Sequence, residues 1–195
     1  MIKVYVKYAE GVCFTATLRD KEILRVTLGI DQERAIDTIR SSVTKKEDLE
    51  VYMQSSKQVS SLFGALKELY DGKDTTYCFL LADTHLPSYS QRVLSAVSAI
   101  PKGYITSYGA VAKAVGGGAR AVGNVMAANP FPLIIPCHRV VKSDWGLGGY
   151  GAGGLGVKLE LLKREQQNYS EPKEIKTNPG VLKVFPTEIV LKKYC

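Results

Sequence analysis

The 195-residue sequence is poor in the residues that bind metals or form disulfide bonds. It contains two histidines, one tryptophan and four cysteines, which are Cys13, Cys78, Cys137 and Cys195. The cysteines lie far apart and form no CxxC pair, so their spacing predicts neither a disulfide framework nor a zinc knuckle. Cys13, Cys78 and His85 stay open as an alternative, but they match no ligand spacing, and we expect no metal site.

The sequence also lacks any hydrophobic run long enough to span a membrane. Its first residues lack the apolar core of a signal peptide. Hydrophobic residues make up 45% and charged residues 23%, which is typical of a globular protein. We therefore expect an intracellular protein without a membrane partner, cytoplasmic or, if the source is eukaryotic, nuclear. The length suffices for one or two domains.

The net charge of +7 is unevenly distributed along the chain. Residues 1–87 carry 12 Lys and Arg against 13 Asp and Glu, and residues 88–167 carry 9 against 3. The last 28 residues carry 5 against 3. A basic segment beside a nearly neutral one favours a polyanion as partner of residues 88–167. The alternative is a solvated basic face that binds nothing.

The first 83 residues show strand and helix patterns but no constellation of reactive side chains. Alternating apolar and polar residues predict strands over 2–8, 12–18 and 22–27. Apolar residues at helical spacing predict helices over 31–41 and 60–70, and residues 78–81 are a further candidate strand. The residues of this half therefore indicate no reaction of their own.

The second half reads mainly as short helices. A helix from Ser88 to Ile100 is expected to begin with a capping box between Ser88 and Gln91. Two helices, over 107–115 and 119–128, flank a glycine run and outline a helix-turn-helix, the second being unusually slim. A helix over 155–167 follows, with Lys158 expected in solvent. Residues 168–195 are expected to pack against the body of the protein.

The stretch Pro136-Cys137-His138-Arg139-Val140 carries the clearest chemical signal. A cysteine acts as a nucleophile when it is a thiolate, and a neighbouring imidazole favours that form. The competing interpretation is a buried core cysteine. Asn129-Pro130 precedes this stretch, and the glycine-rich residues 146–154 follow it. In this order the motifs resemble the active-site signature of the O6-alkylguanine-DNA alkyltransferases, the methylated-DNA–protein-cysteine methyltransferases.

The resemblance implies an α/β protein with two domains. It places an N-terminal ribonuclease-H-like α/β domain with a structural role at residues 1–83 and a linker at 84–87. A winged helix-turn-helix-like domain that binds DNA and carries the active-site cysteine follows at 88–167. Residues 168–195 extend beyond the family's motifs.

The resemblance also implies the reaction. An alkyl group moves irreversibly from O6-alkylguanine, and also from O4-alkylthymine, in double-stranded DNA to Cys137. The base is flipped into the pocket, each molecule reacts once, no cofactor is needed, and the protein is a monomer. His138 resembles the base that removes the thiol proton through a water. Glu165 resembles the carboxylate that orients His138, with Glu160 as its competitor, and Asn129 resembles the residue that holds the cysteine turn.

Further residues are implied to contact DNA and the flipped base. Arg120 resembles the finger that replaces the extruded base, and Tyr108 the tyrosine beside it. The other expected DNA contacts are Ser107, Lys142 and Asn124. The expected pocket residues are Tyr108, Met126, Val140, Tyr150 and Gly151. The sequence departs from the family twice, because one extra residue separates Cys137 from Glu165 and Gly151 stands where many relatives have serine.

Two other functions compete with alkyl transfer. A helix-turn-helix regulator would carry more Arg, Asn or Gln along its recognition helix than residues 119–128 offer. A Cys–His hydrolase would turn over many times, whereas an alkyl acceptor stops after one equivalent. If the acceptor cysteine lies in a tight turn, we also expect little spare volume for the transferred group.

Overall fold

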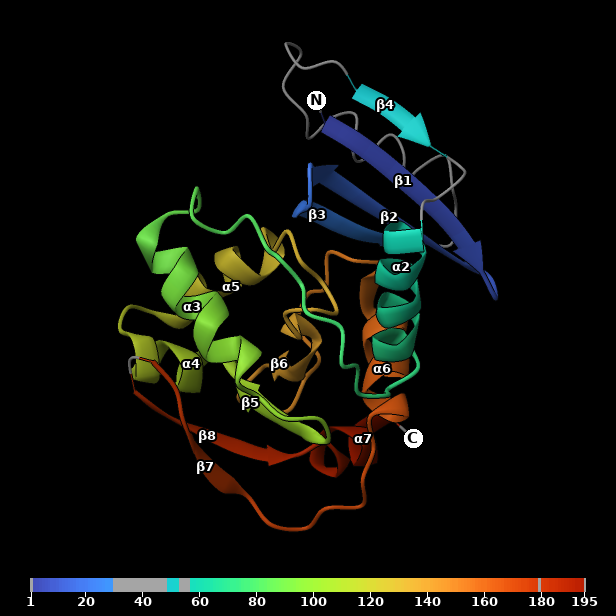
Figure 1. The fold of residues 1–195 in the computed structure, drawn as a ribbon. Helices are drawn as coiled ribbons and strands as arrows, with labels where there is room; N and C mark the ends of the chain where they lie inside the picture. The colour runs from blue at the N-terminus through green and yellow to red at the C-terminus, as the bar shows by residue number, and fades with distance from the viewer. Residues whose placement is uncertain (1, 30–48, 53–56, 179, 195) are drawn as a thin grey trace.

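The structure is a computed structural model that describes residues 2–29, 49–52, 57–178 and 180–194. The predicted helix over 31–41 and Cys195 lie outside the described residues. Two four-stranded sheets form the framework, and helices pack around them (Figure 1). Within the described ranges, no helix has both the length and the apolar character needed to cross a membrane.

The first sheet has the strand order β3-β2-β1-β4. Its three predicted strands are confirmed as β1 (Ile2–Ala9), β2 (Val12–Arg19) and β3 (Glu22–Gly29), which are antiparallel. A fourth strand, β4 (Leu49–Tyr52), runs parallel to β1. Helix α2 (Lys57–Tyr70) packs on this sheet, where the ring of Tyr70 meets that of Phe14 edge-on at 5.7 Å.

The candidate strand at residues 78–81 is wrong as predicted. Only Leu81 forms a bridge, with Ile23 of β3. Two hydrogen bonds support it: the Ile23 amide donates to Leu80 at 2.8 Å, and the Ala82 amide donates to Ile23 at 3.0 Å. A single bridge does not make a strand, so this segment adds none to the sheet, and Leu80 is 54% exposed.

The second sheet has the order β6-β5-β8-β7. Strand β5 (Tyr104–Ser107) lies parallel to β6 (Val140–Val141) and antiparallel to β8 (Val181–Pro186), which pairs with β7 (Lys173–Lys176). The helices of this half are α3 (Ser88–Ser98), α4 (Tyr108–Val115), α5 (Ala119–Ala127), α6 (Gly154–Arg164) and α7 (Glu188–Tyr194).

Helix α3 begins at Ser88 as predicted, but the expected capping box is wrong. The N-cap is Pro87, and no side chain caps the helix. The side-chain Nε2 of Gln91 instead donates to the carbonyl of Leu86 at 2.7 Å and to that of Thr84 at 3.3 Å. Proline has no side-chain acceptor, so Pro87 cannot form the reciprocal hydrogen bonds of a capping box. The Gln91 side chain instead holds the segment that leads into the helix.

The described part of residues 168–195 packs against the body, as expected, and also completes the second sheet. Strand β8 lies between β5 and β7, and its Leu182 and Val184 are fully buried. Their neighbour Val181 is 55% exposed, which is the alternation of a strand with one buried face. The sheet that supports the middle of the chain therefore depends on its last residues.

The C-terminal ends of helices α2 and α6 meet and join the two halves of the chain; the two helices overlap in the view of Figure 1. The Arg164 guanidinium lies 4.5 Å from the centre of the Tyr70 ring and donates to Asp71 Oδ1 at 3.1 Å. The first half of the chain thus fixes one side of α6. This matters because α6 and the residue after it carry Lys158 and Glu165, two charged groups of the site described below.

Substitutions on the two faces of β8 test its place in the core. We expect Leu182→Ala to lower the free energy of unfolding by about 2–5 kcal/mol, because it leaves a cavity between β8 and its neighbours. Val181→Ala, one residue away on the exposed face, should change it by less than about 0.5 kcal/mol. Thermal or denaturant unfolding of both variants measures the difference, and equal effects would contradict the burial of β8.

Candidate active site

The cysteine turn is fastened by one asparagine. Cys137 begins a single turn of 3₁₀-helix after Pro136. The Asn129 side-chain amide donates to the carbonyl of Ile135 at 3.2 Å, and its oxygen accepts from the amide of Phe131 at 3.0 Å. Asn129 therefore ties the end of α5 to the segment that leads into Cys137.

Behind the cysteine lies a buried group of charged and ionisable side chains. His138 Nε2 is 2.9 Å from Glu165 Oε1, with both side chains at most 3% exposed. Arg139 donates two hydrogen bonds to the same carboxylate, from Nε to Oε2 at 2.8 Å and from Nη2 to Oε1 at 2.7 Å. Arg139 also donates to the carbonyl of Ile100, two residues after α3. The carboxylate is thus held from two sides.

These contacts set the charges of the pair. Burial alone would raise the pKa of Glu165, but the hydrogen bonds from His138 and Arg139 and the positive charge of Arg139 hold it well below the usual carboxyl range. Burial lowers the pKa of His138, and Glu165 offsets this only in part. A neutral His138 with an ionised Glu165 places the imidazole proton on Nε2, between the two groups. Nδ1 is then an acceptor, and it has no hydrogen-bond partner among the described residues.

Lys158 was predicted to be solvated, and this is wrong. The side chain is fully buried, and its Nζ donates to the carbonyl of Val140 at 2.7 Å and to that of Gly149 at 3.2 Å. Burial lowers the pKa of Lys158 to about 8, and the Cys137 thiolate opposes that shift. The sequence held a signal for this. Residues 158, 161, 162 and 165 share one helical face, because they recur at intervals of three and four.

Cys137 itself is 6% exposed. Burial raises the pKa of its thiol, whereas the Asn129 side chain and the charge of Lys158 act to lower it. The thiol is therefore protonated at rest, beside groups that favour its ionised form.

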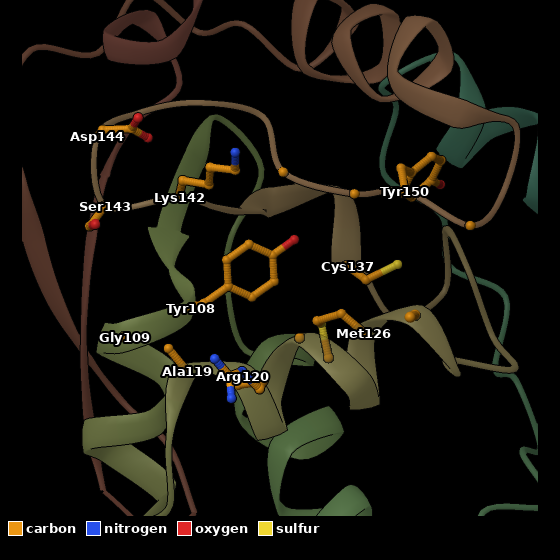
Figure 2. Close-up of a pocket in the computed structure, with 15 residues that line it drawn as sticks. Tyr108, Gly109, Ala119, Arg120, Met126, Cys137, Lys142, Ser143, Asp144 and Tyr150 are labelled. Atoms are coloured by element: carbon orange, nitrogen blue, oxygen red, sulfur yellow. The ribbon is translucent and has the colours of Figure 1, made fainter.

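Cys137 opens onto a pocket of about 730 Å³ (Figure 2). Six other lining residues were predicted to contact DNA or the base: Tyr108, Arg120, Met126, Lys142, Tyr150 and Gly151. The other lining residues, most of them small, were not named as pocket residues, although five of them lie in the slim helix or the glycine-rich stretch 146–154: Gly109, Ala119, Gly123, Ala127, Ser143, Asp144, Gly148 and Gly149. The expectation that Cys137 has little spare volume is therefore wrong, because the sulfur borders this space.

Three predicted contact residues lie outside the pocket lining. Val140 is fully buried, and its carbonyl accepts from Lys158, so its side chain forms no pocket wall. Ser107 caps α4 by accepting from the amide of Ala110 at 3.1 Å. Asn124 is exposed on α5. Glu160, the competitor of Glu165, pairs with Arg164 on the surface and does not reach His138.

Cys13, Cys78 and His85 do not come together. Across the described ranges, no three His, Cys, Asp or Glu side chains are grouped so that they could hold a metal ion.

Comparisons with known proteins point to one family. Residues 88–167 match the model of the 6-O-methylguanine DNA methyltransferase DNA-binding domain. The chain is 38% identical over 108 residues to a methylated-DNA–protein-cysteine methyltransferase of Methanothermobacter thermautotrophicus, covering 55% of this chain and 61% of that relative. For a Pyrobaculum aerophilum protein of the same name, identity is 56% over 66 residues, with 34% and 44% covered. The matches thus span less than two thirds of these two relatives.

Solved structures agree with this. The fold matches the Mycobacterium tuberculosis O6-methylguanine methyltransferase with a TM-score of 0.68 and 26% identity, over 85% of this chain and 93% of that one. A structure of Mycobacterium tuberculosis OGT in complex with DNA matches with a TM-score of 0.67 and 26% identity, over 84% and 92%.

One relative is matched over most of its length. An Archaeoglobus fulgidus methylated-DNA–protein-cysteine methyltransferase is 34% identical over 134 residues, which are 59% of this chain and 90% of that relative. Together with the domain match, this shows that the chain belongs to the methylated-DNA–protein-cysteine methyltransferase family.

Proposed function

We propose that this protein repairs DNA by moving an alkyl group from O6 of guanine to Sγ of Cys137, once per molecule. The observation that carries the proposal is the place of Cys137. It lies between a pocket of about 730 Å³ and the buried side chains of His138, Glu165 and Arg139. A nucleophile with an oriented base behind it and an open pocket in front is what such a transfer requires.

The proton moves ahead of the alkyl group. Neutral His138 accepts the thiol proton at Nδ1, through a water, while Nε2–H remains bonded to Glu165. The Sγ–carbon bond then forms as the bond between that carbon and O6 breaks. The departing guanine takes up the proton, so charge and atoms balance. The product is a thioether, which offers no thiolate for a second transfer. The reaction needs no cofactor.

Two residues stabilise the thiolate while it exists. Lys158 supplies a positive charge in a site of low dielectric, where a charge acts more strongly than in water. Asn129 contributes a hydrogen bond from the turn. Lys158 also holds the carbonyl of Gly149, and so fixes the glycine segment over the pocket beside Tyr150.

The same pocket faces the proposed DNA. Helices α4 and α5 would form the helix-turn-helix of a winged domain, with α5 near the minor groove. Small residues along α5 leave Arg120 free to enter the stack, while Tyr108 borders the flipped base. Ser107, Lys142 and Asn124 would meet phosphates, giving salt-dependent binding with little sequence preference.

Further features follow from the same proposal. O4-alkylthymine in DNA would be a second substrate. The protein would act as a monomer, in the cytoplasm or, if the source is eukaryotic, in the nucleus. The first sheet, taken as a ribonuclease-H-like domain, would have a supporting role through α2 and α6.

The reaction should modify one residue, once. Incubation with duplex DNA bearing O6-methylguanine should add a single methyl group to Cys137, measured by intact mass and peptide mapping. Cys137→Ser should accept none. Methylation of Cys13, Cys78 or Cys195, or product that accumulates beyond one equivalent, would contradict the proposal and favour a hydrolase.

The two carboxylates near the end of α6 form a matched pair for testing the proton relay. Glu165→Gln should slow the single-turnover transfer on the order of 10- to 1000-fold, because His138 loses its ionised partner, while DNA affinity barely changes. Glu160→Gln removes only a surface pair with Arg164 and should react at the wild-type rate. An unchanged rate in Glu165→Gln would make the carboxylate a bystander.

A further inference from the structure

The loop formed by residues 142–147 is one wall of the pocket. Its backbone makes a tight turn, in which the Trp145 amide donates to the carbonyl of Lys142 at 3.1 Å and the Lys142 amide donates to that of Gly146 at 2.8 Å. Lys142, Ser143 and Asp144 line the pocket from this turn, across from Met126 and Arg120 of α5 (Figure 2). The conformation of the turn therefore sets the distance across the pocket mouth.

Trp145 has an unfavourable backbone conformation in this turn. Its φ is +64°, in the left-handed region that glycine or asparagine normally occupies in tight turns. A bulky aromatic residue stays in that region only when surrounding contacts hold it there. The residues that make those contacts therefore hold the loop in its conformation.

The contacts come from the C-terminal residues 181–194. The Trp145 ring packs edge-on against that of Phe185 in β8, with centroids 4.9 Å apart. Tyr194 Oη accepts from the amide of Leu147 at 3.2 Å, and Lys193 Nζ donates to the carbonyl of Asp144 at 3.1 Å. Leu147 is buried in one cluster with Val190 and Leu191 of α7. Both the tip and the end of the loop are thus held by the same segment.

We propose that β8 and α7 hold the loop 142–147 in place, which makes Trp145, Phe185 and Tyr194 positioning residues for the pocket wall that meets duplex DNA. This rests on the proposed function for its consequence in repair. The glycine segment next to Cys137 has a separate anchor, the bond from Lys158 to Gly149. Loosening the C-terminal contacts should therefore alter the mouth of the pocket and leave the surroundings of the sulfur unchanged.

The loop contains the only tryptophan of the chain, so fluorescence reports its position directly. We expect Phe185→Leu and Tyr194→Phe each to increase acrylamide quenching of Trp145. Tyr169→Phe is the matched control: Tyr169 is 42% exposed, close to the 40% of Tyr194, and its ring stacks on that of Tyr104 in β5. Acrylamide should quench Trp145 in this variant to the same extent as in the wild type. If Phe185→Leu does not fold, Tyr194→Phe still carries the test.

The reaction arm compares two substrates. Transfer from duplex DNA bearing O6-methylguanine should slow about three- to thirty-fold in the two variants, because a displaced wall misplaces the duplex. Transfer from free O6-benzylguanine should change less than about twofold, because it needs no contact with the duplex. Unchanged quenching in both variants, or equal losses on both substrates, would overturn the inference. A wild-type protein that accepts no alkyl group would refute the proposed function, while quenching would still show whether the C-terminal segment holds the loop.

Discussion

The structure depends on how buried charges are satisfied around Cys137. Glu165, Arg139 and Lys158 carry charge in a region nearly closed to water, where an unpaired charge is costly. Each has partners: Glu165 is held by His138 and Arg139, and Lys158 by two backbone carbonyls. These partners come from the cysteine turn, the segment after α3 and the glycine segment, so the charges fix where those segments must lie.

The same arrangement explains how the buried Cys137 thiol is protonated at rest and still able to ionise for the reaction. Burial raises the pKa of Cys137 and keeps the resting sulfur protonated, while Lys158 and Asn129 favour the ionised form. His138 stays neutral because burial lowers its pKa, so it is able to take a proton. Helix α6 positions Lys158 directly and Glu165 at its C-cap, and α2 supports α6 through Arg164. The first half of the chain thus contributes to the site without lining it.

The sequence predicted the elements that local patterns encode and missed those that depend on distant contacts. Alternation predicted β1, β2 and β3, and the motif around Cys137 led to Glu165 and to most of the named pocket residues. Lys158 was missed because its charge suggested solvent, although its helical face pointed inward. The place of β8 between β5 and β7 was not foreseen, since the pairing of Ile105 with Phe185, far apart in the sequence, leaves no local signal. The slim helix and the glycine-rich stretch were noticed, but their Gly and Ala residues were not predicted to line the pocket, because small residues carry no chemistry of their own.

The most direct test of this account is the pKa of the Cys137 thiol, measured from the pH dependence of its alkylation by iodoacetamide with peptide mapping. If the buried charge of Lys158 favours the thiolate, Lys158→Met should move the titration of Cys137 to higher pH. Lys158→Arg, which keeps the charge, should stay nearer the wild type, and Lys163→Met, on the exposed side of α6, should not shift it. A Cys137 pKa that is unchanged or lower in Lys158→Met would contradict the account.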